Sequence, residues 1–143
     1  MKKTRMILLS FAFIFAAFVF TPTKSEASSI VNWSEWRPVP KAGATCEARV
    51  GTDAYTYYKG ATTVDYQLQA RGKCNRIYYK ASIAAKGTQT GYFSTNTPIK
   101  SINISSFTVG AGSYGLSMDA ELFADSAMTN FAGWAITSIF VYR

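Results

Sequence analysis

Asp119 and Glu121 are the two carboxylates whose spacing comes closest to that of a catalytic pair. On a strand, residues two apart share a face at about 6–7 Å, which approaches the carboxyl separation found in glycoside hydrolases. Both residues, however, lie on the polar side of an alternating segment, where a solvated surface is the ordinary role of acidic side chains. Together with Asp125 they would suit a weak calcium site. We interpret all three as surface residues and predict neither a metal nor a cofactor.

The chain contains no histidine. Its absence removes the usual general base, the Ser-His-Asp triad, the Cys-His dyad and most zinc and iron sites. Residues 110–115 satisfy the G-x-G-x-x-G spacing of dinucleotide sites, but they open an alternating strand where that motif must open a helix. We therefore predict a protein that is not an enzyme and binds no nucleotide.

Tyrosines beside basic residues are the positive indication of a binding surface. They are dense between Tyr55 and Phe93, where lysines and arginines are interleaved with them. Exposed tyrosine next to a cation suits stacking on sugar rings or seating among lipid headgroups. The alternative is that these tyrosines simply fill half-buried strand positions. The candidate ligand-binding residues are Tyr57, Tyr58, Tyr78, Tyr79, Arg76 and Lys80.

Residues 1–27 have the pattern of a secretory signal peptide. A basic start at 2–5 precedes the apolar run 6–20, and the small residues Ser25 and Ala27 mark a cleavage position. At about 1.5 Å per residue the run reaches about 22 Å, short of the roughly 30 Å hydrocarbon core of a bilayer. We expect cleavage after Ala27 and a secreted, extracellular protein.

The charge of the remaining chain is mildly positive. The whole chain has a formal net charge of +7, and residues 1–27 hold four basic residues and one acidic residue, so four net positive charges remain. This balance favours an anionic partner, which we expect to be a cell-wall or other surface polymer, or an anionic membrane. We expect no nucleic acid as partner, because the basic residues do not form a dense stripe.

Cys46 and Cys74 are the two cysteines of the chain. In an exported protein an even number of cysteines normally pairs, and two cysteines allow one connectivity. Two thiols without histidine make a poor zinc set. We predict a Cys46–Cys74 disulfide that joins the start of one strand to the end of the next.

Alternation of apolar and polar residues predicts β-strands at 63–71 and 114–124. The segment 132–142 is apolar on both faces, which indicates a central strand. With turn residues between such segments, we expect an all-β fold, a small antiparallel β-sandwich or barrel of about six to eight strands with one disulfide. Further candidate strands are 46–58, 76–85 and 102–109.

The predicted organisation is a cleaved signal peptide at 1–27, an extended lead-in at 28–44 and a single β domain at 45–143. The predicted function is non-catalytic binding of an extracellular glycan or anionic surface through tyrosine and Lys/Arg side chains. Two alternatives stay open: a membrane-active or antagonistic effector resembling a toxin or bacteriocin, and a secreted inhibitor or matrix protein.

Overall fold

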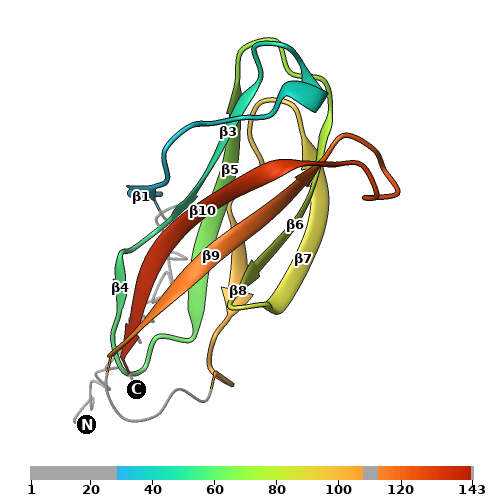
Figure 1. Cartoon of the computed structure of the whole chain (residues 1–143). Coiled ribbons are helices and arrows are strands. Elements are labelled where there is room, and N and C mark those ends of the chain that lie inside the picture. The colour runs from blue at the N-terminus through green and yellow to red at the C-terminus, as the bar shows by residue number, and fades with distance from the viewer. Residues whose placement is uncertain (1–28, 108–112, 143) are drawn as a thin grey trace, which may run out of the picture.

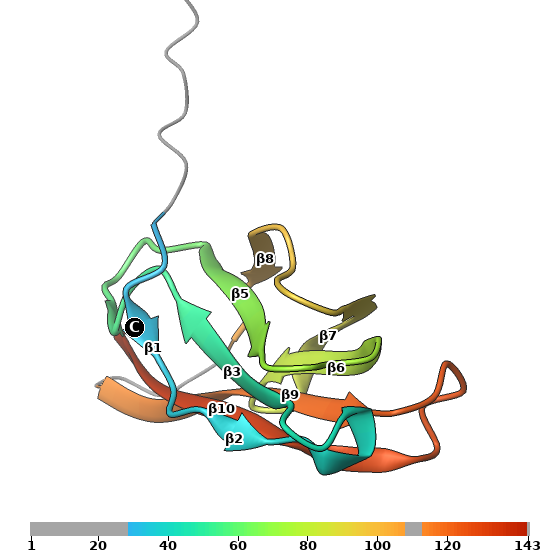
Figure 2. The same cartoon turned by 90° about the horizontal axis from the view of Figure 1, so that it is seen from above.

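The computed structural model describes residues 29–107 and 113–142. Within them the chain forms two β-sheets packed face to face, which Figure 1 shows from the side and Figure 2 from above. The predicted signal peptide at 1–27 and the glycine turn at 110–112 lie outside the described residues. Among the described residues, no helix has the length and apolar character needed to span a bilayer.

Sheet A contains five antiparallel strands in the order β1-β3-β5-β8, and β2 also pairs with β3. Sheet B has the order β4-β10-β9-β6-β7, with β4 parallel to β10 and the other pairs antiparallel. The strands of sheet A are β1 (Asn32–Trp33), β2 (Arg37–Pro38), β3 (Glu47–Thr52), β5 (Thr63–Arg71) and β8 (Lys100–Asn103). Those of sheet B are β4 (Thr56–Tyr57), β6 (Ile77–Ile83), β7 (Lys86–Phe93), β9 (Ser113–Phe123) and β10 (Phe131–Tyr142).

The all-β antiparallel sandwich predicted from alternation is confirmed. On β5 the apolar side chains of Val64, Tyr66 and Leu68 are buried between the sheets, and on β9 Met118 and Leu122 are buried in the same way. The strand β5 has the predicted bounds. The strand count exceeds the expected six to eight for three reasons: the predicted strand 46–58 is divided between the two sheets, the lead-in supplies two short strands, and β7 lies in a segment where no strand was predicted.

The lead-in is part of the sandwich. Trp33 pairs with Gly51 and Arg37 with Ala48, so β1 and β2 follow one another along the same edge of β3. A 3-10 turn, η1 (Pro40–Ala42), follows, and the flanking Val39 is fully buried. Because the Asn32 side-chain amide also donates to the Ser138 carbonyl on β10 at 2.9 Å, the lead-in bridges the two sheets along one side.

The predicted disulfide is present between Cys46, just before β3, and Cys74, just after β5. The two Cα atoms are 4.8 Å apart, beside the register pair Glu47–Arg71 that ends the β3–β5 ladder. Gly72 allows the chain to turn here, since its φ is +82° and a Cβ would lie 2.0 Å from the Thr45 carbonyl oxygen. The cross-link therefore fixes the end of a hairpin-like pair of strands through two cysteines that are 28 residues apart in sequence.

A tight turn of two alanines joins β6 to β7. Ile83 pairs with Lys86, and Ala84 and Ala85 between them have φ values of 48° and 61°. A two-residue turn with positive φ at both positions is of type I′, for which Asn-Gly is the preferred sequence. An alanine in this left-handed region costs about 1–2 kcal/mol, so the strand pairing on either side imposes the turn.

Replacing both Cys46 and Cys74 with serine should lower the free energy of unfolding by about 3–4 kcal/mol, because a closed loop of this length restricts the unfolded chain. Denaturant unfolding of the oxidised protein and of the double variant measures the difference. Two alkylatable thiols in native secreted protein, or a double variant as stable as the parent, would contradict the assignment of a stabilising cross-link.

Replacing Ala84-Ala85 with Asn-Gly should raise the free energy of unfolding by about 1 kcal/mol, because both residues accept the left-handed conformation more readily than alanine. Ala127→Gly, in an exposed turn where the alanine has ordinary φ, is the matched control and should be neutral or destabilising. A loss of stability in the Asn-Gly variant would show that the turn is not strained.

Candidate functional site

Two of the predicted binding residues, Tyr57 and Tyr79, lie in the core. Tyr57 is 4% exposed, and its hydroxyl donates to an Asp53 carboxylate oxygen at 2.6 Å. Tyr79 is 1% exposed and packs its ring edge against Phe93. A surface polymer cannot reach either ring, so both residues are removed from the candidate site. Period-two alternation places neighbouring tyrosines on opposite faces, but it does not reveal which face is covered by the second sheet.

Tyr58 is strongly exposed, at 70%, and lies far from Tyr78, Arg76 and Lys80. Its ring stacks on that of Tyr142 with centroids 5.5 Å apart. We call Tyr58 and Tyr142 the distal pair, because β4 meets β10 at Phe140 and Val141, at the end of β10 opposite to Phe131. At about 3.3 Å per residue the two ends of β10 are roughly 35 Å apart.

The remaining predicted residues, Tyr78, Arg76 and Lys80, come together on the outer face of sheet B. Tyr78 and Lys80 alternate with the buried Tyr79 on β6, so they lie on the outer face, where both are half-buried. Just before β6, the Arg76 guanidinium lies 4.6 Å from the ring centroid of Tyr92 on β7. The Lys80 ammonium lies 5.0 Å from the Phe123 ring centroid on β9. Each cation is thus held over an aromatic ring on a neighbouring strand.

These rings lie in a row across four strands of sheet B, in which two groups of ring contacts are joined by the backbone pairing of β6 with β9. Tyr78 and Tyr92 have ring centroids 6.0 Å apart, and Tyr78 is the register partner of Phe123. Phe123 contacts Phe131 edge to face at 6.0 Å, and Phe131 contacts Trp134 at 5.4 Å. With strands about 4.8 Å apart, the row extends about 14 Å across the sheet. We call it the aromatic band, and its members are Tyr92, Tyr78, Phe123, Phe131 and Trp134.

A β-bulge at the start of β10 completes the aromatic band. The register shifts between Phe131, which pairs with Phe123, and Gly133, which pairs with Leu122. Residues three apart on a regular strand point to opposite faces, and the extra residue of a bulge cancels this alternation. The bulge therefore lets Phe131 and Trp134 share the outer face. Gly133 permits it, because its φ of +154° is a conformation that residues with a side chain rarely adopt.

Acidic residues border the aromatic band on the same face. Glu121 lies between Lys80 and Trp134 in the strand register, and Asp119 accepts a hydrogen bond from the Ser117 hydroxyl at 2.8 Å. Asp125 instead accepts hydrogen bonds from the Asn130 backbone and from the hydroxyl and backbone of Thr129, which lower its pKa and fix the β9–β10 turn. Within residues 29–107 and 113–142, no group of three or more His, Cys, Asp or Glu side chains could hold a metal ion.

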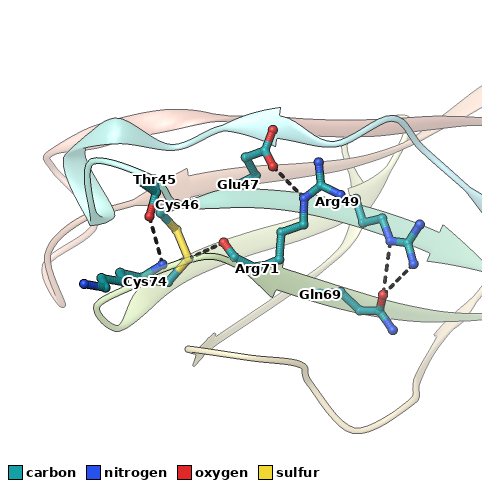
Figure 3. A network of polar contacts seen from close by, with 8 residues as sticks. Thr45, Cys46, Glu47, Arg49, Gln69, Arg71 and Cys74 are labelled. Carbon is teal, nitrogen blue, oxygen red and sulfur yellow. Dashed lines mark hydrogen bonds and ion pairs between the residues drawn. A yellow bond between two sulfur atoms is a disulfide. The ribbon is translucent and has the colours of Figure 1, made fainter.

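The outer face of sheet A is covered by its own side chains, as Figure 3 shows for its polar part. The Arg49 guanidinium lies 4.3 Å from the ring centroid of Trp33 and 4.4 Å from that of Trp36, and it donates to the Gln69 side-chain oxygen. Arg71 pairs with Glu47 and also lies over Trp36. Burial, and then the charge of Arg71, lower the pKa of Arg49. The cations and indoles of this face already partner one another.

The sequence analysis missed Phe123, Phe131 and Trp134 as members of the site. The signal was present, since the segment 132–142 is apolar on both faces and a strand with one face on the core must then expose the other side chains. We interpreted that pattern as a central strand. In the structure β10 pairs with β9 along its length but with β4 at only one end, and Trp134 remains 45% exposed.

Comparison with known proteins adds an independent finding. Residues 29–143 match the family described as YqgA MG2 macroglobulin domain. A protein named cell wall-binding protein YqgA, from Bacillus subtilis (strain 168), is 37% identical over 108 residues, which are 70% of this chain and 72% of that protein. No solved structure matches the chain. The family match includes the lead-in together with the rest of the sandwich.

Burial of tyrosine hydroxyls should make the protein unfold at alkaline pH. Burial raises the pKa of Tyr57 and Tyr66 above the ordinary value of about 10, helped by Asp53 at Tyr57 and by Tyr79 at Tyr66. Above pH 10 the unfolded chain releases both protons while the folded chain keeps them, so the free energy of unfolding falls as pH rises.

Denaturant unfolding between pH 9 and 11 measures this fall, which should be up to about 1.4 kcal/mol per pH unit for each tyrosine. The double variant Tyr57→Phe with Tyr66→Phe removes both titrating groups and should show a flatter dependence. An unchanged slope in that variant would contradict the assignment.

Proposed function

Because the chain belongs to the family of YqgA MG2 macroglobulin domains, we propose that it is an extracellular, non-catalytic protein that binds a cell-wall polymer through the aromatic band. The relative from Bacillus subtilis is named for cell-wall binding, and the match between the two chains covers about 70% of each. The fold and the family support a binding role on the outer side of the cell. The binding surface is our inference from the structure.

The row of rings on one open sheet face is the observation that carries the proposal. Tyr92, Phe131 and Trp134 are exposed and Tyr78 is half-buried, so a polymer can reach them, while Phe123 is 5% exposed and supports Phe131 from below without meeting the polymer itself. The face of an aromatic ring carries partial negative charge and attracts the C–H groups on the flat side of a sugar ring. Rings fixed on a rigid sheet lose little conformational freedom when a polymer binds to them.

Arg76 and Lys80 supply a second, electrostatic contribution. Both are attached to the aromatic band through their contacts with Tyr92 and Phe123, so an anionic group of a bound polymer would meet a cation beside each ring. Exposed charge interactions of this kind are screened within about 8–10 Å at physiological ionic strength. Binding should therefore weaken as the salt concentration rises but should not disappear, because salt does not screen the stacking of rings on sugars.

The distal pair is a secondary contact in this proposal. Tyr58 and Tyr142 are exposed beside the far end of β10, about 35 Å from Phe131 along the strand. A long polymer that follows β10 would contact both the aromatic band and the distal pair. A short oligosaccharide would reach only one of them. Tyr58→Ala is therefore expected to weaken retention on intact walls and to leave the binding of short fragments unchanged.

The double variant Tyr92→Ala with Trp134→Ala should lose at least about tenfold in affinity for isolated cell walls, because aromatic side chains at the centre of an interface commonly account for more than 1 kcal/mol each. The measurement is co-sedimentation with purified walls at low and high salt, with folding checked by circular dichroism. Ile99→Ala, which removes an exposed apolar side chain just before β8 of sheet A, away from the aromatic band and the distal pair, is the matched control and should bind normally.

Anionic lipid vesicles form a parallel arm of the same experiment. Absence of wild-type binding to walls at low salt would reject wall binding. Normal binding by the double variant would reject the aromatic band as its site. Retention on vesicles alone would instead favour the membrane-active alternative.

A further inference from the structure

An open pocket lies beside the aromatic band, between β2 of the lead-in and β10. Its volume is about 280 Å³, and it is lined by Arg37, Pro38, Trp134 and Ile136. Figure 2 shows β2 running next to β10 at this side of the sandwich. The bulge at Gly133 brings the two segments close, since a Cβ there would lie 3.6 Å from the Pro38 carbonyl oxygen. The lead-in and the aromatic band thus build the pocket together, with Trp134 belonging to both.

Arg37 differs from the other arginines of the described chain in having an unengaged guanidinium. It is exposed, and among the described residues it makes no side-chain hydrogen bond, ion pair or ring contact. Arg49 and Arg71 are occupied by the indoles and polar side chains of sheet A, and Arg76 lies over Tyr92. A cation at a pocket mouth with its donors free is available to a ligand.

The walls of the pocket determine what kind of ligand suits it. A guanidinium presents paired N–H donors that match a carboxylate or a phosphate in a bidentate geometry. The Trp134 indole, the Pro38 ring and the Ile136 side chain provide apolar surface beside it, with Trp134 and Ile136 each almost half exposed. A free inorganic anion would leave this apolar surface unused, and a neutral sugar would leave Arg37 without a partner.

We propose that the pocket binds an anionic unit of the wall polymer, namely a sugar ring or short segment next to a phosphodiester or carboxylate, with the anion on Arg37 and the apolar part on Trp134. This inference rests on the proposed function and extends it, because it assigns recognition of charge to a residue of the lead-in outside the aromatic band. The carboxylates of Asp119 and Glu121, on the same face, already have other partners. Asp119 accepts a hydrogen bond from the Ser117 hydroxyl, and Glu121 lies next to Lys80 in the strand register.

The experiment compares the wild type with Arg37→Gln on three preparations of cell wall: native walls, walls stripped of phosphate polymers by hydrofluoric acid, and stripped walls whose carboxylates have been amidated. Arg37→Gln should weaken binding about fivefold, the upper range for an exposed ion pair, wherever the recognised anion is present. Lys73→Gln removes an exposed cation elsewhere and is the control for net charge. Arg37→Lys keeps the charge but loses the paired donors, and should give an intermediate affinity.

The arms separate the sources of the anion. An effect of Arg37→Gln that is lost on stripped walls identifies a phosphodiester, and one that persists there but is lost after amidation identifies a carboxylate; both outcomes support the proposal. Equal binding of wild type and Arg37→Gln on native walls overturns it, as does an effect that survives on the amidated walls. If the wild type binds none of the three wall preparations, the proposed wall binding by the aromatic band is itself wrong, and this outcome differs from failure of the Arg37 site alone.

Discussion

The antiparallel pairing of β9 with β10, and the bulge that interrupts it, determines what this sandwich presents to its surroundings. The register pairs continue from Tyr142 back to Gly133 and then shift before Phe131. On the inner side this pairing places alternate residues of both strands in the core. On the outer side the shift brings Phe131 next to Trp134 and in line with Phe123. Without the bulge, Phe131 and Trp134 would face opposite sides of the sheet, and only one of them could join the row of rings.

The two outer faces of the sandwich differ in how much aromatic surface they expose, because the lead-in covers one of them. Trp33 rests against Gly51, where a Cβ would approach its ring within 2.5 Å, and Arg49 is held between Trp33 and Trp36. These contacts satisfy the polar and aromatic groups of sheet A internally. Among the described residues sheet B has no such cover over Trp134, and an open pocket lies between Trp134 and Arg37. Exposed aromatic surface on a rigid sheet is the feature expected of an interaction site.

Much of the fold follows from the sequence, because a strand buried on one face has alternating apolar and polar residues. The bounds of β5 and the disulfide between Cys46 and Cys74 were predicted on this basis and on the pairing of cysteines in exported proteins. The candidate site followed less well. Tyr57 and Tyr79 were assigned to a surface that the structure buries, since alternation gives the two faces of a strand without saying which one meets the other sheet. The aromatic band depends on pairing between strands distant in sequence and on a bulge, and neither leaves a local pattern.

The central claim is that the outer face of sheet B, and not that of sheet A, binds the wall polymer. The chain offers a direct test, because its three tryptophans divide between the faces, with Trp134 on sheet B and Trp33 and Trp36 on sheet A. Titration of the ¹⁵N-labelled protein with enzymatically solubilised wall fragments, followed through the three indole N–H resonances, reports on both faces at once. The account predicts that the Trp134 resonance shifts while those of Trp33 and Trp36 stay in place. Shifts at Trp33 and Trp36 with an unchanged Trp134 would contradict it.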